Sequence, residues 1–160
     1  MATRNGSHPA AATPPEPLRG RVAIVTGGSG GIGGAVTEHL ASLGARVVVG
    51  YVGDPAPAEQ LVAALNSGSL APRAVAVDAD VSDPAQVARL FDAAQAAFGP
   101  DLHILVAAAG VQDAAYPPIA DTTAEQWDRA FGVNARGAFL CCREAARRLE
   151  RGGAGRIVTF

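Results

Sequence analysis

A glycine-rich segment near the start of the chain has the composition of a phosphate-binding turn. Residues 26–33 read TGGSGGIG, directly after the apolar run Val22–Val25 and before the helical-looking stretch Ala35–Leu43. A strand, a glycine-rich turn and a helix in this order form a site where the diphosphate of a dinucleotide lies on backbone N–H groups at a helix N-terminus. Glycine matters because a Cβ here would keep the backbone away from the diphosphate. The segment predicts a dinucleotide-binding turn, with a tight turn that binds no ligand as the alternative.

The turn fits two patterns of glycine spacing. Read from Gly28 it is G-x-G-x-x-G, and read from Thr26 it is T-G-x-x-x-G-x-G. Later segments favour the second pattern. They are DVSD at Asp80–Asp83, AAAG at Ala107–Gly110 and WDRAFGVNARGAFLCC at Trp127–Cys142.

Together these four segments resemble the N-terminal half of the short-chain dehydrogenase/reductase family, over Arg21–Phe160. The family carries a T-G-x-x-x-G-I-G turn, a D-V-x-D segment, an N-N-A-G strand end and an N-x-x-G helix. The resemblance implies the cofactor-binding part of an NAD(P)(H)-dependent oxidoreductase, similar to NADPH-dependent aldehyde reductases and 3-oxoacyl-carrier-protein reductases. Its complete form would move a hydride between the nicotinamide and a small carbonyl or alcohol substrate.

The resemblance also implies a role for individual residues. Asp80 would accept a hydrogen bond from the adenine amino group, whereas Asp83 is expected only to cap a helix. Asn134 is the implied catalytic residue, because the family's helix asparagine holds a water of the proton relay through its backbone carbonyl. A hydrogen-bonded amide in the core is the alternative for Asn134. The implied cofactor-binding residues are Thr26, Gly27, Ser29, Gly31, Ile32, Gly33, Tyr51, Asp80, Val81, Ala108, Ala109 and Gly110.

The chain departs from the family in two respects. It has AAAG at Ala107–Gly110 where N-N-A-G is usual, so we expect the loss of amide hydrogen bonds that tie the fourth strand to its neighbours. It also has no lysine, and Tyr51 and Tyr116 lie too early for the family's Tyr-x-x-x-Lys pair. We therefore expect this chain to be inactive on its own. A catalytically inactive dinucleotide-binding or regulatory protein is the alternative function.

Cofactor preference depends on the residue that ends the second strand. An acidic residue there holds both ribose hydroxyls of NAD and repels the 2′-phosphate of NADP. This chain has Tyr51, eighteen residues after Gly33, so we expect NADP(H) to be favoured over NAD(H). Two neighbours oppose the preference: Gly30 stands where many NADP-using relatives have an arginine, and Asp54 lies close by.

The elements that must position these residues alternate between strand and helix. We expect an α/β fold with a Rossmann-type, doubly wound parallel sheet in the order 3-2-1-4-5, truncated after the fifth strand, because crossovers are right-handed. The expected strands are Val22–Val25, Arg46–Tyr51, Ala74–Val77, Ile104–Gly110 and Arg156–Phe160, and the expected helices are Ala35–Leu43, Ala58–Leu65, Pro84–Phe98 and Thr122–Leu149.

Local signals mark the ends of these helices. Asp83 is expected to cap the third helix, with Pro84 at its first position and Gln86 three residues after the cap. Thr122 and Glu125 predict a capping box for the long helix that follows. Gly44 predicts the C-terminal end of the first helix.

Composition limits the partners and the location. A formal net charge of −2 and an isoelectric point near 5.9 do not indicate a basic surface that would bind nucleic acid or an anionic membrane. Residues 1–20 read as a disordered leader and 21–160 as one NAD(P)-binding domain, incomplete at its C-terminus. We expect a cytoplasmic protein, with an organelle reached through a transit segment as the alternative. Cys141 and Cys142 are adjacent, which predicts neither a disulfide nor a metal site.

Assembly is expected to involve the long helix and the last strand. In the family this helix builds a four-helix subunit interface, so the resemblance implies a homodimer or homotetramer for the complete form. In this chain we expect Phe131, Val133, Phe139 and Leu140 to be uncovered in part, and Arg156–Phe160 to be an unprotected sheet edge. The isolated chain is therefore expected to be prone to aggregation or only partly folded.

Overall fold

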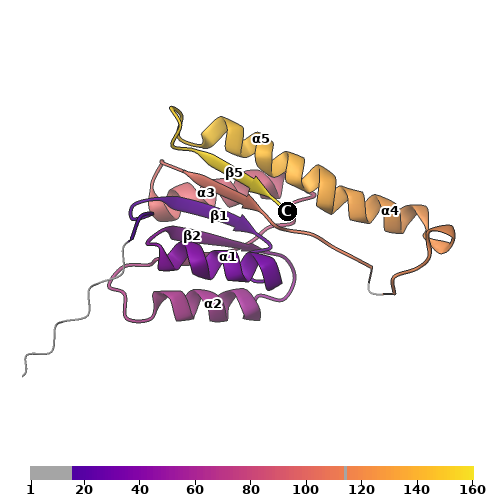
Figure 1. The fold of residues 1–160 in the computed structure, drawn as a ribbon, viewed down its shortest axis with the longest axis horizontal. Coiled ribbons are helices and arrows are strands. Elements are labelled where there is room, and N and C mark those ends of the chain that lie inside the picture. The colour runs from indigo at the N-terminus through magenta and orange to yellow at the C-terminus, as the bar shows by residue number, and fades with distance from the viewer. Residues whose placement is uncertain (1–15, 114) are drawn as a thin grey trace, which may run out of the picture.

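The computed structural model describes residues 16–113 and 115–160 as an α/β fold with a parallel sheet between helices (Figure 1). The predicted leader therefore lies outside the described residues as far as residue 15. Its remaining part forms a turn that contacts the end of the first helix, where Leu18 N–H donates to the Leu43 carbonyl at 2.9 Å.

The sheet has five parallel strands in the order β3-β2-β1-β4-β5, as the sequence predicts. Their bounds are β1 Val22–Thr26, β2 Arg46–Tyr51, β3 Ala74–Asp78, β4 Ile104–Ala107 and β5 Arg156–Thr159. The first four are short apolar runs, typical of strands that are covered on both faces. β5 differs, because all four of its residues are exposed.

Helices cover both faces of the sheet. The helices are α1 Gly31–Ser42, α2 Ala56–Asn66, α3 Pro84–Phe98, the short 3₁₀ turn η1 Ile119–Asp121, α4 Ala124–Phe131, the π-helical segment η2 Gly132–Gly137 and α5 Ala138–Arg148. α1 and α2 lie on one face of the sheet, and α3 and α5 lie on the other (Figure 1).

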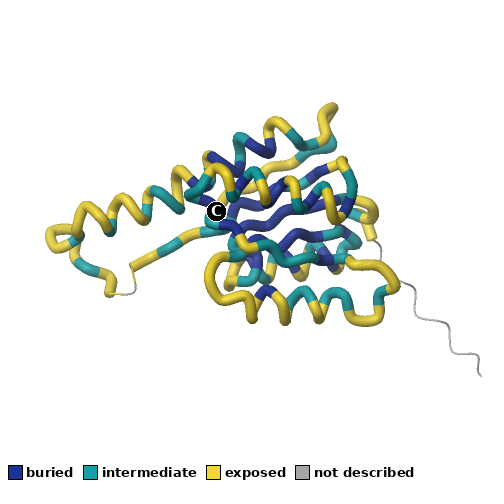
Figure 2. The backbone as a smooth tube through the Cα atoms, turned by 180° about the vertical axis from the view of Figure 1, so that it is seen from behind, coloured by how far each residue is buried: buried dark blue, intermediate teal, exposed yellow. Residues whose placement is uncertain are grey.

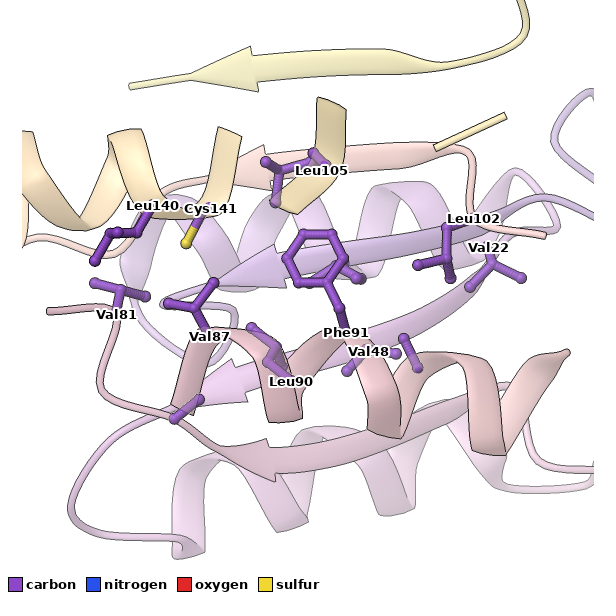
Figure 3. Close-up of a cluster of buried hydrophobic side chains, with 14 of the residues drawn as sticks. Val22, Val48, Val81, Val87, Leu90, Phe91, Leu102, Leu105, Leu140 and Cys141 are labelled. Carbon is purple, nitrogen blue, oxygen red and sulfur yellow. The ribbon is translucent and has the colours of Figure 1, made fainter. Parts of the chain in front are cut away.

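Alternate residues of β1, β2, β3 and β4 supply the two cores. Ile24 and Leu105 point into the cluster with α3 and α5, which Figure 3 shows around Phe91 and Leu90. The intervening residues, such as Val25, point into the cluster with α1 and α2. This period of two in a parallel sheet gives the site a rigid floor.

Of the two predicted N-terminal helix caps, the cap of α3 is confirmed and the cap of α4 is wrong. Asp83 caps α3 as expected, accepting from Ala85 N–H at 2.8 Å. The capping box of α4 is formed by Thr123 and Gln126, so the prediction of Thr122 with Glu125 was wrong by one residue. Both pairs match the same pattern, and the chain uses the second.

The predicted long helix is a continuous rod of α4, η2 and α5, and α4 extends beyond the sheet (Figure 1). Its exposed course is visible in Figure 2. Phe131 and Phe139 are 49% and 59% exposed, as expected, and Val133 is half-buried against the core. Leu140 was wrongly expected on the uncovered side: it is 3% exposed, because it packs into the core beneath α5 (Figure 3).

A charged cluster joins α5 to α3. Glu144 is 7% exposed and accepts hydrogen bonds from Arg147 and Arg148 at 2.9 and 3.1 Å. Arg148 also donates to Asp92 on α3. A buried carboxylate needs such partners, because an unpaired one would cost several kcal/mol. The cluster therefore fixes α5 against the body of the molecule.

No described helix has the length and apolar content required to cross a membrane.

Candidate functional site

The carboxyl ends of β1, β2 and β4 meet at one point of the sheet. Thr26 at the end of β1 is paired with Gly50 on one side and with Ala107 on the other. The strand order reverses between β1 and β4, because β2 and β3 lie on one side of β1 and β4 and β5 on the other. Ligands of open parallel sheets bind outside the carboxyl ends at such a switch point.

The glycine turn after β1 has no room for a Cβ at three positions, Gly27, Gly28 and Gly33. Gly27 has φ +62°, and a Cβ there would lie 2.9 Å from the carbonyl oxygen of Ala108. A Cβ on Gly33 would lie 2.1 Å from the carbonyl oxygen of Gly27. The turn therefore brings β1, the end of β4 and the start of α1 closer together than any other residue type allows.

The N-terminus of α1 has no side-chain cap. Gly30 precedes the helix with extended backbone and supplies no capping oxygen, whereas α3 and α4 are capped by Asp83 and Thr123. An α-helix begins with N–H groups that lack partners within the helix, and together they attract an anion. Gly31 and Ile32 in this first turn are exposed. These residues fit the diphosphate of a dinucleotide.

The side chains of Thr26 and Asn134 hold the end of β4 although the family's amides are missing. Thr26 Oγ1 accepts hydrogen bonds from Ala108 N–H and Ala109 N–H, both at 3.2 Å. Beyond Gly110, Val111 donates its N–H to Asn134 Oδ1 at 2.8 Å and accepts from Asn134 Nδ2 at 2.9 Å. The strand end is thus fixed to β1 on one side and to η2 on the other.

The Asp80 segment after β3 is tied in the same way. Asp80 Oδ1 accepts from the N–H and the hydroxyl of Ser82, both at 2.8 Å. Arg136 of η2 donates to the Ser82 carbonyl at 2.5 Å. Val81 is buried against Gly137, where a Cβ would lie 2.6 Å from Val81 Cγ2. The segment and η2 therefore form one packed unit.

A cavity of about 400 Å³ lies between these segments. Of the predicted cofactor residues, six line it: Gly27, Tyr51, Asp80, Val81, Ala109 and Gly110. The others, Thr26, Ser29, Gly31, Ile32, Gly33 and Ala108, belong to the turn or the strand ends but not to the cavity wall. The residues that the sequence did not predict are Val52, Ala79, Ser82, Val111, Asp128, Arg129, Gly132 and Val133.

The positions of these additional residues explain why they were missed. Val52 and Val111 each follow a predicted site residue, so the carboxyl ends of the strands could have indicated them. Asp128 and Arg129 lie on exposed α4, where the sequence shows only a polar helix face. They reach the cavity because α4 extends past the end of the sheet.

Asn134 does not line the cavity. It lies in the π-helical segment, a structure often found at functional sites. Its side chain is exposed and spans Val111 with both amide atoms. The alternative of a core amide is therefore wrong in its location, because the amide is hydrogen-bonded but exposed. The role predicted for the backbone carbonyl of Asn134 stays a prediction.

Two carboxylates outside the cavity wall add to the charge of Asp80, Asp128 and Arg129, which line it. Asp54, beyond β2, accepts from Ala56 N–H at 3.0 Å and so places a carboxylate at the start of α2. The hydrogen bond from the Gln86 side chain, followed by that from Ala85 N–H, lowers the pKa of Asp83, which therefore stays ionised as the cap of α3.

Comparisons with known proteins agree with this geometry. The family model described as "short chain dehydrogenase" matches residues 21–160. A protein of Arabidopsis thaliana described as "NADPH-dependent aldehyde reductase-like protein, chloroplastic" is 50% identical over 159 residues, which cover 95% of this chain and 59% of that protein. A second, "NADPH-dependent aldehyde reductase 2, chloroplastic" of the same species, is 49% identical over 154 residues and covers 91% of this chain and 57% of that protein.

Solved structures give the same result. A short chain dehydrogenase from Burkholderia cenocepacia J2315, determined in complex with NADP, superposes with a TM-score of 0.80 at 38% identity. The match covers 89% of this chain and 56% of that structure. The chain thus spans less than three fifths of the length of each of these relatives.

Proposed function

This chain belongs to the short-chain dehydrogenase family, and from that premise we propose that it is the dinucleotide-binding part of an oxidoreductase that prefers NADP(H). The observation that carries the proposal is the turn at Gly27 and Gly33, where no Cβ fits and where the uncapped N-terminus of α1 opens toward the switch point of the sheet. We propose residues 21–160 as the domain that holds the cofactor.

Each segment has its own part in holding the cofactor. The exposed first turn of α1, with Gly31 and Ile32, would hold the diphosphate by its N–H groups. Asp80 and Val81 would bind the adenine, and Ala109 and Gly110 would approach the cofactor through their backbone at the end of β4. The bound nicotinamide supplies or accepts a hydride, and the small carbonyl or alcohol substrate belongs to the complete enzyme.

The preference for NADP rests on Tyr51 and on the relatives. Tyr51 lines the cavity from the end of β2 and carries no charge that would repel a 2′-phosphate. Two relatives are described as NADPH-dependent, and the Burkholderia structure contains NADP. Asp54 opposes the preference, because it adds a carboxylate at the start of α2.

For this chain alone we propose binding without turnover. A lysine would be needed to lower the pKa of the tyrosine that transfers the proton, and the sequence has none. Asn134 would contribute only its backbone carbonyl to such a relay. No contact among the described residues favours the alternative of a regulatory protein that senses the cofactor.

The test is a fluorescence titration of the purified chain with NADPH and with NADH. We expect NADPH to bind more tightly than NADH, and no oxidation of NADPH in the presence of a panel of aldehydes and ketones. Gly27→Ala, which would place a Cβ against Ala108, should abolish binding. Equal affinity for both cofactors would contradict the preference, and absence of binding to either would contradict the function.

Assembly and location are proposals as well. We propose that the complete enzyme is a homodimer or homotetramer that uses the exposed face of α4 and α5. For location we keep the cytoplasm as our prediction, although two relatives are described as chloroplastic, which supports the organelle alternative. A fluorescent protein fused after Gly20 would distinguish these two, since only a transit segment carries it into an organelle.

A further inference from the structure

The buried hydroxyl of Thr37 contacts the glycine turn. Thr37 lies on α1 and is fully buried at 0% exposure. Its Oγ1 donates a hydrogen bond to the carbonyl oxygen of Gly28 at 3.0 Å. Threonine within a helix commonly bonds to a carbonyl three or four residues earlier, here Gly34 or Gly33. Thr37 instead reaches the turn nine residues earlier.

Gly28 is therefore held from both sides. Its N–H donates to the carbonyl of Gly50 on β2 at 2.9 Å, and its carbonyl accepts from Thr37. The space around it is closed as well, because a Cβ on Gly28 would lie 2.7 Å from the Val25 carbonyl oxygen and 3.2 Å from Thr37 Oγ1. Thr37 thus supplies both a hydrogen bond and part of the wall.

This contact sets the direction of the next N–H group. The peptide bond is planar and trans, so the carbonyl of Gly28 and the N–H of Ser29 point in opposite directions. Because Thr37 holds that carbonyl toward the interior, the N–H of Ser29 points away from it, toward the open side of the turn. Ser29 is half-buried and Gly30 is exposed, so an anion can approach from that side.

We propose that Thr37 is a positioning residue for the phosphate turn, which fixes the peptide between Gly28 and Ser29 so that the Ser29 N–H faces the diphosphate of the cofactor. The inference rests on the proposed cofactor function. Thr37 touches no ligand itself and acts through Gly28. A turn without this hydrogen bond would have to order the peptide during binding, which costs affinity.

The experiment compares Thr37→Val, Thr37→Ser and Thr37→Ala in the full chain. Valine keeps the shape and removes the hydroxyl, while serine and alanine both lack the methyl group and differ in the hydroxyl alone. Each variant is titrated with NADPH and with adenosine 2′-monophosphate, which carries the adenine and the 2′-phosphate but no diphosphate. Thermal unfolding is recorded in the same buffer.

We expect Thr37→Val and Thr37→Ala to bind NADPH about 5- to 20-fold more weakly than the wild type, in line with the loss of one buried hydrogen bond. The affinity of Thr37→Ser for NADPH should stay within about twofold of the wild-type value. The affinity of all variants for adenosine 2′-monophosphate should also stay within about twofold, because a twofold change in affinity is smaller than the contribution of one hydrogen bond. A merely structural role would weaken both ligands alike.

Four outcomes would overturn the proposal. The first is normal NADPH binding by Thr37→Val, and the second is an equal loss of affinity for both ligands. The third is NADPH binding by Thr37→Ser that is as weak as that by Thr37→Ala. The fourth is that Thr37→Ser folds while Thr37→Val and Thr37→Ala do not, which would show that the hydroxyl serves the fold.

NADPH binding by the wild type distinguishes failure of the proposed function from failure of the inference about Thr37. If the wild type fails to bind NADPH, the proposed function falls together with the inference, whereas normal binding by wild type and Thr37→Val removes only the inference.

Discussion

At the scale of single residues, Tyr51 and His103 show how the two ends of the sheet differ. Tyr51 ends β2 at the carboxyl edge and lines the cavity, whereas His103 precedes β4 at the opposite edge and is 8% exposed. The sequence indicated Tyr51 because its position relative to the glycine turn is fixed by the strand. It did not indicate the hydrogen bond that His103 makes.

Cofactor preference is tested at Tyr51. In Tyr51→Asp, a carboxylate would face the 2′-phosphate, and the repulsion should lower the ratio of NADPH to NADH affinity about tenfold or more. Tyr51→Asn is the matched control, because it has the same size as aspartate without the charge. Titration of both variants with both cofactors gives the ratio. If Tyr51→Asp and Tyr51→Asn show the same ratio of NADPH to NADH affinity, charge at this position does not determine the cofactor preference.

The second residue-scale prediction concerns His103 and pH. Its Nδ1 accepts the N–H of Val22 at 3.2 Å, which requires the neutral ring, and burial followed by the nearby Arg21 lowers the pKa of His103 below its usual value. The unfolded chain therefore binds the proton more readily, so this contribution to stability is present in full above about pH 6.5 and is lost as the pH falls from that value toward the lower pKa of the folded state. The melting temperature should drop between about pH 7.5 and pH 5.5.

The control is His103→Gln, whose side-chain oxygen can accept from Val22 N–H but does not titrate. The wild type should lose more of its melting temperature over this pH interval than His103→Gln does. Parallel loss in both chains would show that other groups are responsible.

At the scale of elements, the sequence predicted the features that depend on the spacing of apolar residues and on the residue types in turns. β2 begins and ends as expected, and the strand order followed from the handedness of the crossovers. α1 begins at Gly31, four residues before the expected Ala35, because glycine is a poor helix former and hides the start. The π-helical segment could not be predicted, because Asn134 alone looks like any polar residue within a helix.

The glycine turn gives an element-scale prediction with a built-in control. A Cβ on Gly33 would lie 2.1 Å from Gly27, whereas one on Gly31 would meet no atom within 4 Å. Gly33→Ala should therefore destabilise the fold by about 1–3 kcal/mol and abolish NADPH binding. Gly31→Ala should keep the stability and weaken only binding, since it crowds the exposed first turn of α1. Urea unfolding and NADPH titration separate the two effects. Unchanged stability of Gly33→Ala would contradict the close approach seen here.

At the scale of the whole molecule, part of the exposed apolar surface lies on β5 and α4. β5 forms an edge of the described sheet, and its Ile157 and Val158 are 43% and 45% exposed. Trp127 and Phe131 stack on α4 with ring centroids 4.1 Å apart, and both are 49% exposed. The sequence indicated the edge strand and part of the helix face, but it could not show that Leu140 turns inward, because this depends on packing against α3.

We predict that the chain self-associates with increasing concentration, mainly through the β5 edge, because exposed strand edges pair with other chains. Val158→Lys should reduce the association seen by sedimentation velocity, since a charged side chain on an edge strand opposes such pairing. Phe139→Lys, on the exposed face of α5, is the matched control and should have the smaller effect. A larger effect of Phe139→Lys would assign the association to the helix face instead.

The π-helical segment can absorb a change in the length of the chain. A π-turn holds one residue more than an α-turn, and each residue of an α-helix advances the direction of its side chains by about 100°. Because the wide turn accommodates its extra residue, deleting one residue from Gly132–Gly137 would leave an unbroken α-helix with α4 in nearly the same direction. Asp128 and Arg129 would then stay at the cavity, and Gln126 would keep its contact with Asp113. A deletion of one residue should therefore be tolerated better in this segment than in α5, where it would turn α4 by about 100° about the common axis.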